Sequence, residues 1–95
     1  MDRPFGSFVW NVGKEAANIR KHGVDFETAA RVFQDPARKI FVDERHSEME
    51  ERLFCVGQVE GTVLTVRFTY REERIRIYGA GYWRRGRRYY EQENP

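Results

Sequence analysis

The sequence predicts an α+β fold in which two N-terminal helices pack on an antiparallel sheet of three or four strands, followed by a C-terminal helix. Apolar residues recur with a helical period before Pro36 and alternate with period two from Lys39 to Tyr78. Aromatic residues then return to a helical period in the tail. The length of 95 residues fits one domain, expected to span residues 1–95.

The first helix is expected to begin after Asn11, a typical N-cap residue, and to end at Gly23, which favours the left-handed backbone of a helix end. The apolar stretch 8–10 before it is too short to be more than an edge strand. Ala16, Ala17 and Ile19 are expected to form the apolar stripe of this helix.

The second helix is expected to begin after Asp25, again an N-cap residue. It should stop at Asp35-Pro36, because the residue before a proline disfavours the helical conformation. Four apolar residues with i, i+3, i+4, i+7 spacing predict its buried face: Phe26, Ala29, Ala30 and Phe33.

Strands are expected at residues 39–42, 53–59, 62–70 and 74–78, with a polar, acidic stretch at 43–51 and a tight turn at Glu60-Gly61. Alternation places Leu64, Val66 and Phe68 on one face, and Thr65, Arg67 and Thr69 on the other. If the helices cover the apolar face, the opposite face is polar and cationic.

A last helix is expected over residues 82–92. Its aromatic and small residues share one sector of a helical wheel: Tyr82, Trp83, Gly86, Tyr89 and Tyr90. Gly86 costs a helix about 1 kcal/mol relative to alanine, so this helix should depend on docking to the rest of the protein.

Charge is unevenly distributed along the chain, whose net charge is +2. Residues 67–95 carry eight arginines against four acidic residues, whereas residues 1–66 have a net charge of −2. The planar guanidinium group binds phosphate or carboxylate at two points. The C-terminal third therefore suits RNA or an acidic protein partner, although a solvated surface is an equally good interpretation of charge alone.

Several classes of function have no support in the sequence. Cys55 is the single cysteine, and with His22 and His46 it shows no metal-ligand spacing. Glycine-rich nucleotide loops, serine-nucleophile motifs, a signal peptide and a membrane span are all missing. We therefore expect a cytoplasmic protein without metal or cofactor, in which Cys55 is an inert buried thiol.

Acid–base and cationic groups remain: His22, His46, Glu50, Glu51, the arginines and the tyrosines. Metal-independent RNA cleavage requires only such groups, since the 2′-hydroxyl of the RNA is the nucleophile. His22 beside Gly23 also fits a structural role at the end of the first helix.

Several multi-residue motifs occur in order along the chain: Phe8-Val9-Trp10-Asn11, residues 18–29, residues 32–36 and residues 43–52. Together they resemble the BrnT toxin family over residues 8–90. Residues 8–11 and 18–29 are similar to its opening, F-x-W-D and N-x-x-K-H-G-V-S/D-F-E-x-A. Residues 32–36 are similar to V-F-x-D-P, and residues 43–52 to D-x-x-H-S-x-x-E-E-R. Residues 56–57, 69, 71 and 75–77 follow in register.

The resemblance implies a RelE-like fold and a cytoplasmic endoribonuclease toxin that blocks translation. It also implies a BrnA-type ribbon-helix-helix antitoxin, which neutralises the toxin and alone contacts operator DNA. One departure favours an alternative function, a catalytically degenerate module that acts through its antitoxin. Where the family reads I-S-A-R, this chain has Tyr78-Gly79-Ala80-Gly81 and so lacks an arginine, which Arg84 or Arg85 could replace.

Site residues are assigned from the resemblance together with the polar sheet face. The expected catalytic residues are His46, Glu51, Arg52 and Arg76, with Arg76 on the phosphate and His46 and Glu51 as acid and base. Glu51 and Arg52 would also suit a structural ion pair. The expected RNA-binding residues are Arg67, Arg71, Arg74 and Tyr78, and the expected antitoxin contacts are Arg84 and Arg88.

Overall fold

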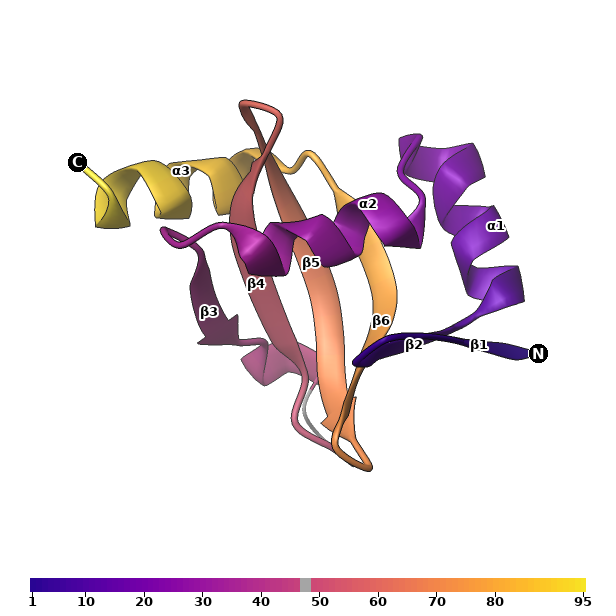
Figure 1. Ribbon diagram of the computed structural model, residues 1–95. Coiled ribbons are helices and arrows are strands. Elements are labelled where there is room, and N and C mark those ends of the chain that lie inside the picture. Colours follow the sequence, from indigo (N-terminus) through magenta and orange to yellow (C-terminus); the bar gives the residue numbers. More distant parts are fainter. Residues whose placement is uncertain (47–48) are drawn as a thin grey trace.

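The computed structural model describes residues 1–46 and 49–95, with the side chain of His46 excluded. Within these residues six strands form one sheet, with α1 and α2 on one face and α3 on the other (Figure 1). The elements are β1 (Asp2–Phe5), β2 (Phe8–Asn11), α1 (Val12–His22), α2 (Phe26–Arg31), β3 (Lys39–Val42), β4 (Leu53–Val59), β5 (Thr62–Arg71), β6 (Arg74–Gly81) and α3 (Arg84–Glu93), with 3-10 turns at Val32–Gln34 and Glu44–His46. No helix in the described ranges is long and apolar enough to cross a membrane.

The α+β class is confirmed, but the prediction of three or four antiparallel strands is wrong. The strand order is β1-β2-β6-β5-β4-β3, and β2 pairs with β6 in parallel. The stretch 8–10 is therefore not an edge strand, because β1 covers its outer side. All four side chains of β1 are exposed. Without a buried face this strand has no apolar alternation to reveal it in the sequence.

Both N-terminal helices begin as expected and α1 ends as expected, whereas α2 ends at Arg31 and the 3-10 turn Val32–Gln34 continues the chain to Asp35. The side chain of Asn11 accepts a hydrogen bond from Lys14 N–H at 3.0 Å, and that of Asp25 accepts one from Thr28 N–H at 2.7 Å. Gly23 has a positive φ of 69°, and its N–H donates to the Ile19 carbonyl. These caps explain why the helix ends could be read directly from the sequence.

The expected apolar stripe of α1 is wrong, because Ala16 and Ile19 are exposed. A buried amide attaches this helix to the sheet instead. The side chain of Asn18 donates to the carbonyls of Val24 and Ala80 at 3.0 and 2.9 Å, and accepts from Ala80 N–H at 3.1 Å. These bonds fix the C-terminal end of α1 beside β6.

The main core lies between the sheet and the two N-terminal helices. Its largest fully buried side chains include Trp10, Phe26, Leu64, Phe68 and Ile77. Cys55 is also fully buried there, and burial raises the pKa of its thiol to about 12. The expectation of a buried thiol is confirmed, and a thiol with so high a pKa is rarely ionised, which agrees with the expected lack of reactivity.

The sequence predicted a polar, cationic face opposite the main core. In the structure α3 covers the upper end of this face (Figure 1). Gly86 of α3 packs directly on Thr65 and Val56, and an ideal Cβ at this glycine would overlap the Thr65 hydroxyl. The Tyr90 hydroxyl donates to Asp35 Oδ2 at 2.7 Å. Docking of α3 therefore leaves only the lower part of this face for Arg67 and its neighbours.

Candidate functional site

A β-bulge shapes the middle of the face that carries α3. Arg67 pairs with Gly79 and Phe68 with Ile77, so Tyr78 is an extra residue in β6. Because of this bulge, Tyr78 and Gly79 both belong to the face opposite the main core. An ideal Cβ at Gly79 would lie 3.3 Å from Arg67 Cδ, so the glycine leaves room for the arginine stem.

Three side chains form what we call the arginine–tyrosine cluster: Arg52, Arg67 and Tyr78. The guanidinium carbons of Arg52 and Arg67 lie 4.3 and 5.2 Å from the centroid of the Tyr78 ring. Arg67 Nε, Arg76 Nε and the Tyr78 hydroxyl are buried without a hydrogen-bond partner among the described residues. Buried donors without partners are rare, so Arg67 Nε and the Tyr78 hydroxyl, both in this cluster, point to a polar ligand.

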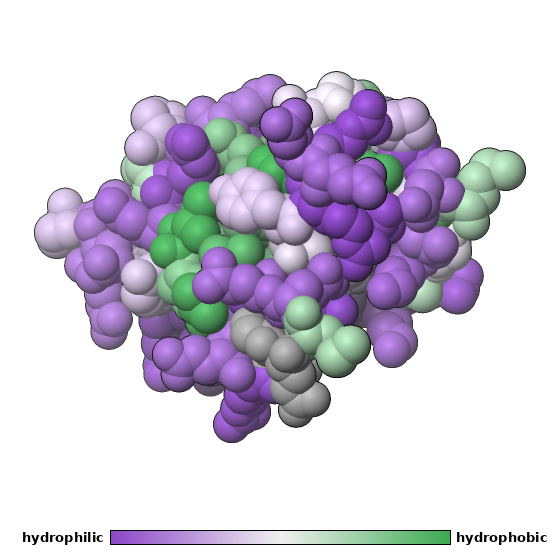
Figure 2. All heavy atoms as spheres, turned by 90° about the horizontal axis from the view of Figure 1, so that it is seen from below, coloured by the Kyte–Doolittle hydropathy of each residue, from purple (hydrophilic) through white to green (hydrophobic). Residues whose placement is uncertain are grey.

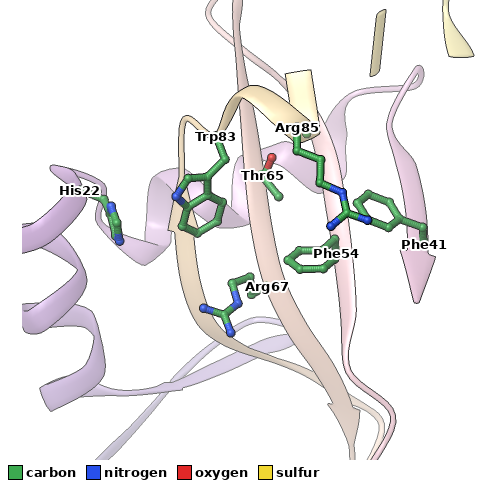
Figure 3. A pocket seen from close by; sticks show the side chains of 8 residues that line it. His22, Phe41, Phe54, Thr65, Arg67, Trp83 and Arg85 are labelled. Carbon is green, nitrogen blue, oxygen red and sulfur yellow. The ribbon is translucent and has the colours of Figure 1, made fainter. Parts of the chain in front are cut away.

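A pocket of about 460 Å³ adjoins this cluster and shares Arg67 with it. Figure 3 shows the side chains that line it, which come from α1, β3, β4, β5 and the start of α3. The lining residues are His22, Phe41, Phe54, Thr65, Arg67, Trp83, Arg85 and Gly86. We call it the aromatic pocket, since three aromatic rings and two arginines suit a stacked, negatively charged ligand.

Trp83 forms one wall of the aromatic pocket because Gly81 has no side chain. An ideal Cβ at Gly81 would lie 2.7 and 2.8 Å from Cε2 and Cζ2 of the indole. The indole also meets the His22 ring edge to face, with the centroids 5.3 Å apart. The glycine that departs from the resemblance is thus what allows the indole to lie here.

The structure brings only some of the expected site residues together. Arg67 and Arg52 flank Tyr78, as described, whereas Arg76 is held by Asp2, with Nη2 to Oδ2 at 2.7 Å and Nη1 to Oδ1 at 3.3 Å. Hydrogen bonding to Asp2 raises the pKa of Arg76, and the same bond lowers the pKa of Asp2. The Arg76 guanidinium therefore already has a carboxylate partner.

Other expected residues lie at the lower end of the sheet. Arg71 donates two bonds to Glu50, at 2.9 and 3.0 Å, and Arg74 is exposed at the start of β6. Arg52 lies 3.7 Å from Glu50. Glu51 is exposed, and its carbonyl accepts from the Thr69 hydroxyl at 2.6 Å. The expected acid–base role of His46 falls on a side chain outside the described part of the chain.

Sequence reasoning missed most of the aromatic pocket. Phe41 and Phe54 come from neighbouring strands, and their rings stack with centroids 5.0 Å apart. Arg85, one of two arginines considered as a replacement at the Gly81 position, lines the pocket. His22 lines it too, and its motif Lys21-His22-Gly23 was the available signal. Among the described residues, no three His, Cys, Asp or Glu side chains form a group that could hold a metal ion.

Comparison with protein families gives a match over residues 10–86 to the ribonuclease toxin BrnT of type II toxin–antitoxin systems. This chain belongs to the BrnT family. The match includes α1, α2, all of β3 to β6 and the first residues of α3, and therefore every residue that lines the aromatic pocket. A search of curated proteins finds no match.

Membership assigns this BrnT-family chain to the ribonuclease toxins and implies an RNA substrate and an antitoxin partner. The arginine–tyrosine cluster and the aromatic pocket can then be considered together as a surface for RNA. A phosphate group suits the Arg67 guanidinium, whose Nε has no hydrogen-bond partner among the described residues, and bases suit the aromatic walls.

Proposed function

We propose that this BrnT-family toxin is a metal-independent endoribonuclease whose active site is the aromatic pocket together with Arg67. One observation carries the proposal: a pocket with aromatic walls opens beside an arginine whose buried Nε has no partner among the described residues. A base can stack in the pocket while the adjoining phosphate binds the guanidinium group. The alternative is a degenerate toxin that binds its antitoxin without cutting RNA.

Base stacking is assigned to Trp83 rather than to Tyr78. Arg52 lies 4.3 Å from the Tyr78 centroid, so a cation already covers this ring. The Trp83 indole borders an open pocket, and an indole offers a large surface for stacking on any base. Tyr78 then holds Arg52 and Arg67 in place for the phosphate.

The reaction needs a proton acceptor, a cation and a proton donor. A base removes the proton of the 2′-hydroxyl, the oxygen attacks phosphorus, and the 5′-oxygen leaves with a proton, which gives a 2′,3′-cyclic phosphate. Arg67 is assigned to the charge that builds on the phosphate oxygens, with Arg85 as the second cation. Both replace the arginine that is missing at Gly81.

Proton transfer is assigned to His22. It is the pocket residue with an imidazole, the side chain that most readily exchanges protons near neutral pH. The motif residues His46 and Glu51 are the alternative candidates for acid–base catalysis. Replacement of each by asparagine or glutamine, with cleavage measured across pH, separates the three candidates.

The partner and its effects complete the proposal. We expect the toxin to inhibit translation by cutting RNA in the cytoplasm, and a BrnA-type ribbon-helix-helix antitoxin to neutralise it. Operator DNA would be contacted through the antitoxin alone. Antitoxin bound to the arginine-bearing surface should dissociate more readily as salt rises, because screening weakens the charged contacts.

The test is cleavage of a single-stranded RNA oligonucleotide by the purified chain in excess EDTA. We expect cleavage with 2′,3′-cyclic phosphate ends, abolished when the nucleotide 5′ of the cut carries a 2′-O-methyl group. Arg87→Ala is the matched control for Arg85→Ala. Both arginines lie on α3, but Arg85 lines the pocket, whereas Arg87 does not line it and pairs with Glu91 at 3.8 Å. Absence of cleavage by a folded chain that still binds antitoxin would support the degenerate alternative.

A further inference from the structure

The outer edge of β3 is one of the two ends of the sheet. β3 follows β4 as the last strand in the order and pairs with no other strand among the described residues. The backbone groups on its free side are a template to which another extended chain can add as a strand. The opposite end of the sheet is formed by β1.

A groove of about 550 Å³ lies between this edge and α3, lined by Phe41, Tyr89, Gln92 and three arginines, Arg84, Arg85 and Arg88. The rings of Phe41 and Tyr89 lie 4.6 Å apart and hold α3 against β3. Within the described part of the chain, these three arginines make no ion pair, whereas Arg87 pairs with Glu91. The groove therefore has uncompensated positive charge and suits an anionic ligand.

The other face of β3 has the opposite character. Ile40 and Val42 are 42% and 44% exposed, because α2 does not reach this edge. Figure 2, seen from below, shows hydrophobic side chains grouped among hydrophilic ones on the side where Figure 1 has β3. A strand added to β3 would thus meet arginines on one face and aliphatic side chains on the other.

We propose that an extended segment of the antitoxin, with alternating acidic and apolar residues, adds to β3 as a seventh strand. This inference rests on the proposed function for the existence of that partner. Alternate side chains of a strand point to opposite faces, so the acidic residues would meet Arg84 and Arg88 and the apolar residues would meet Ile40 and Val42. RNA has neither the backbone amides nor the aliphatic side chains for this edge, which favours a protein.

The position of the segment also accounts for neutralisation. Phe41 and Arg85 line both the groove and the aromatic pocket. A segment in the groove would therefore take contacts that the RNA needs, so that antitoxin and RNA compete.

The first experiment uses the wild-type chain and a blocked nine-residue peptide of alternating glutamate and valine. Two control peptides are N-methylated, one at every valine and the other at every glutamate. In an added strand, every second residue hydrogen-bonds to β3. One of the two N-methylated peptides therefore lacks the N–H groups that these bonds need and should lose binding at least about tenfold. The other is methylated only at N–H groups that point away from β3 and should keep its binding. Equal binding of all three peptides would overturn strand addition.

The second experiment compares the double variant Arg84→Glu/Arg88→Glu with Arg87→Glu. The double variant should bind the peptide at least about tenfold more weakly and still cut RNA, and Arg87→Glu should change neither. If the double variant loses RNA binding and keeps peptide binding, the groove is an RNA track and the proposal is wrong. Peptide binding is measured without RNA, so a wild-type chain that binds peptide but does not cut RNA contradicts only the proposed nuclease.

Discussion

At Gly81 a single hydrogen in place of a side chain decides where an indole lies. Alanine here would bring its Cβ to 2.7 Å from the Trp83 ring, so the indole must leave its place in the pocket wall. We predict that Gly81→Ala weakens binding of an RNA oligonucleotide about tenfold, similar to Trp83→Ala, since one stacked base contributes roughly 1–3 kcal/mol. Fluorescence anisotropy measures this loss. If Gly81→Ala binds RNA as tightly as the wild type while Trp83→Ala binds it more weakly, the indole does not need this place in the pocket wall to bind RNA, and the prediction is wrong.

Arg76 differs from Arg67 in already having a carboxylate partner. Asp2 occupies both of its terminal nitrogens, whereas no hydrogen bond to Arg67 Nε exists among the described residues. We therefore predict that Arg76→Ala and Arg76→Lys lower the cleavage rate less than about tenfold, which is below the effect of Arg67→Ala. The measurement is single-turnover cleavage, with a thermal melt of each variant. A larger loss in Arg76→Ala than in Arg67→Ala would move the phosphate site to Arg76.

Among the elements, α3 depends most on one small residue. Gly86→Ala would raise intrinsic helix propensity by about 1 kcal/mol, yet its Cβ would overlap the Thr65 hydroxyl. Overpacking of this kind costs about 1–3 kcal/mol, so we predict a net loss of stability and a displaced helix. Urea unfolding measures the first effect, and the Trp83 fluorescence, in a variant with Trp10 replaced by phenylalanine, reports the second. A more stable protein with unchanged fluorescence would contradict close packing of α3.

The hydrogen bond from the Tyr90 hydroxyl of α3 to Asp35 makes the free energy of unfolding depend on pH. Burial tends to raise the pKa of Asp35, but hydrogen bonds from Gln58 N–H, the Tyr90 hydroxyl and Ala37 N–H outweigh it and lower the pKa below 3.8. The ionised Asp35 carboxylate therefore stabilises the folded state. This stabilisation is complete above pH 3.8 and is lost as pH falls through the lower, folded-state pKa of Asp35. Burial and the bond to Asp35 raise the pKa of Tyr90 to about 12, so its contribution is lost as pH rises from 10 toward 12.

We predict that Tyr90→Phe removes the alkaline part of this dependence and reduces the acid part. The free energy of unfolding, measured from pH 2 to 11 for both proteins, tests this. Parallel curves for the wild type and Tyr90→Phe would show that the hydroxyl does not contribute.

Elements whose signals are local could be predicted from the sequence. Asn11, Gly23 and Asp25 define helix ends through their own hydrogen bonds and backbone angles, and the long strand β5 shows a clear apolar alternation. β1 could not, because all of its side chains are exposed, and the parallel pairing of β2 could not, because it depends on contacts with β6 more than sixty residues away. The bulge at Tyr78 could not be predicted either. Strict alternation would place Tyr78 and Gly79 on opposite faces of the sheet, whereas the bulge places both on the same face.

At the scale of the whole molecule, the sequence suggested the chemistry of the surface but not the place of the site. The arginine-rich third and the motif resemblance predicted an RNA-binding toxin, and the family match over residues 10–86 agrees. The aromatic pocket combines residues from α1, β3, β4, β5 and α3, which only the folded chain brings together. In the sequence Phe41 and Phe54 look like ordinary strand residues. Trp83 can line the pocket because Gly81, two positions before it, has no side chain.

The whole surface should also show a characteristic salt dependence if RNA binds by phosphate contacts. Each phosphate neutralised on a single strand contributes a slope of about −0.7 to the logarithm of affinity against the logarithm of salt. We predict that Arg67→Ala and Arg85→Ala each make the slope shallower by about 0.7, and that Arg87→Ala leaves it unchanged. Titrations from low to moderate salt measure this. A slope unaffected by Arg67→Ala would remove Arg67 from the phosphate contacts.

The most direct test of the proposed site is single-turnover RNA cleavage by the wild type, Arg67→Ala and Arg67→Lys in EDTA, with protein in excess of both the oligonucleotide and the dissociation constant. If Arg67 holds the phosphate as charge builds in the transition state, alanine should lower the rate about a hundredfold or more. Lysine should restore little, because it offers a point charge in place of the planar fork. Near-normal cleavage by a folded Arg67→Ala variant would contradict the assignment of this face of the sheet as the active site.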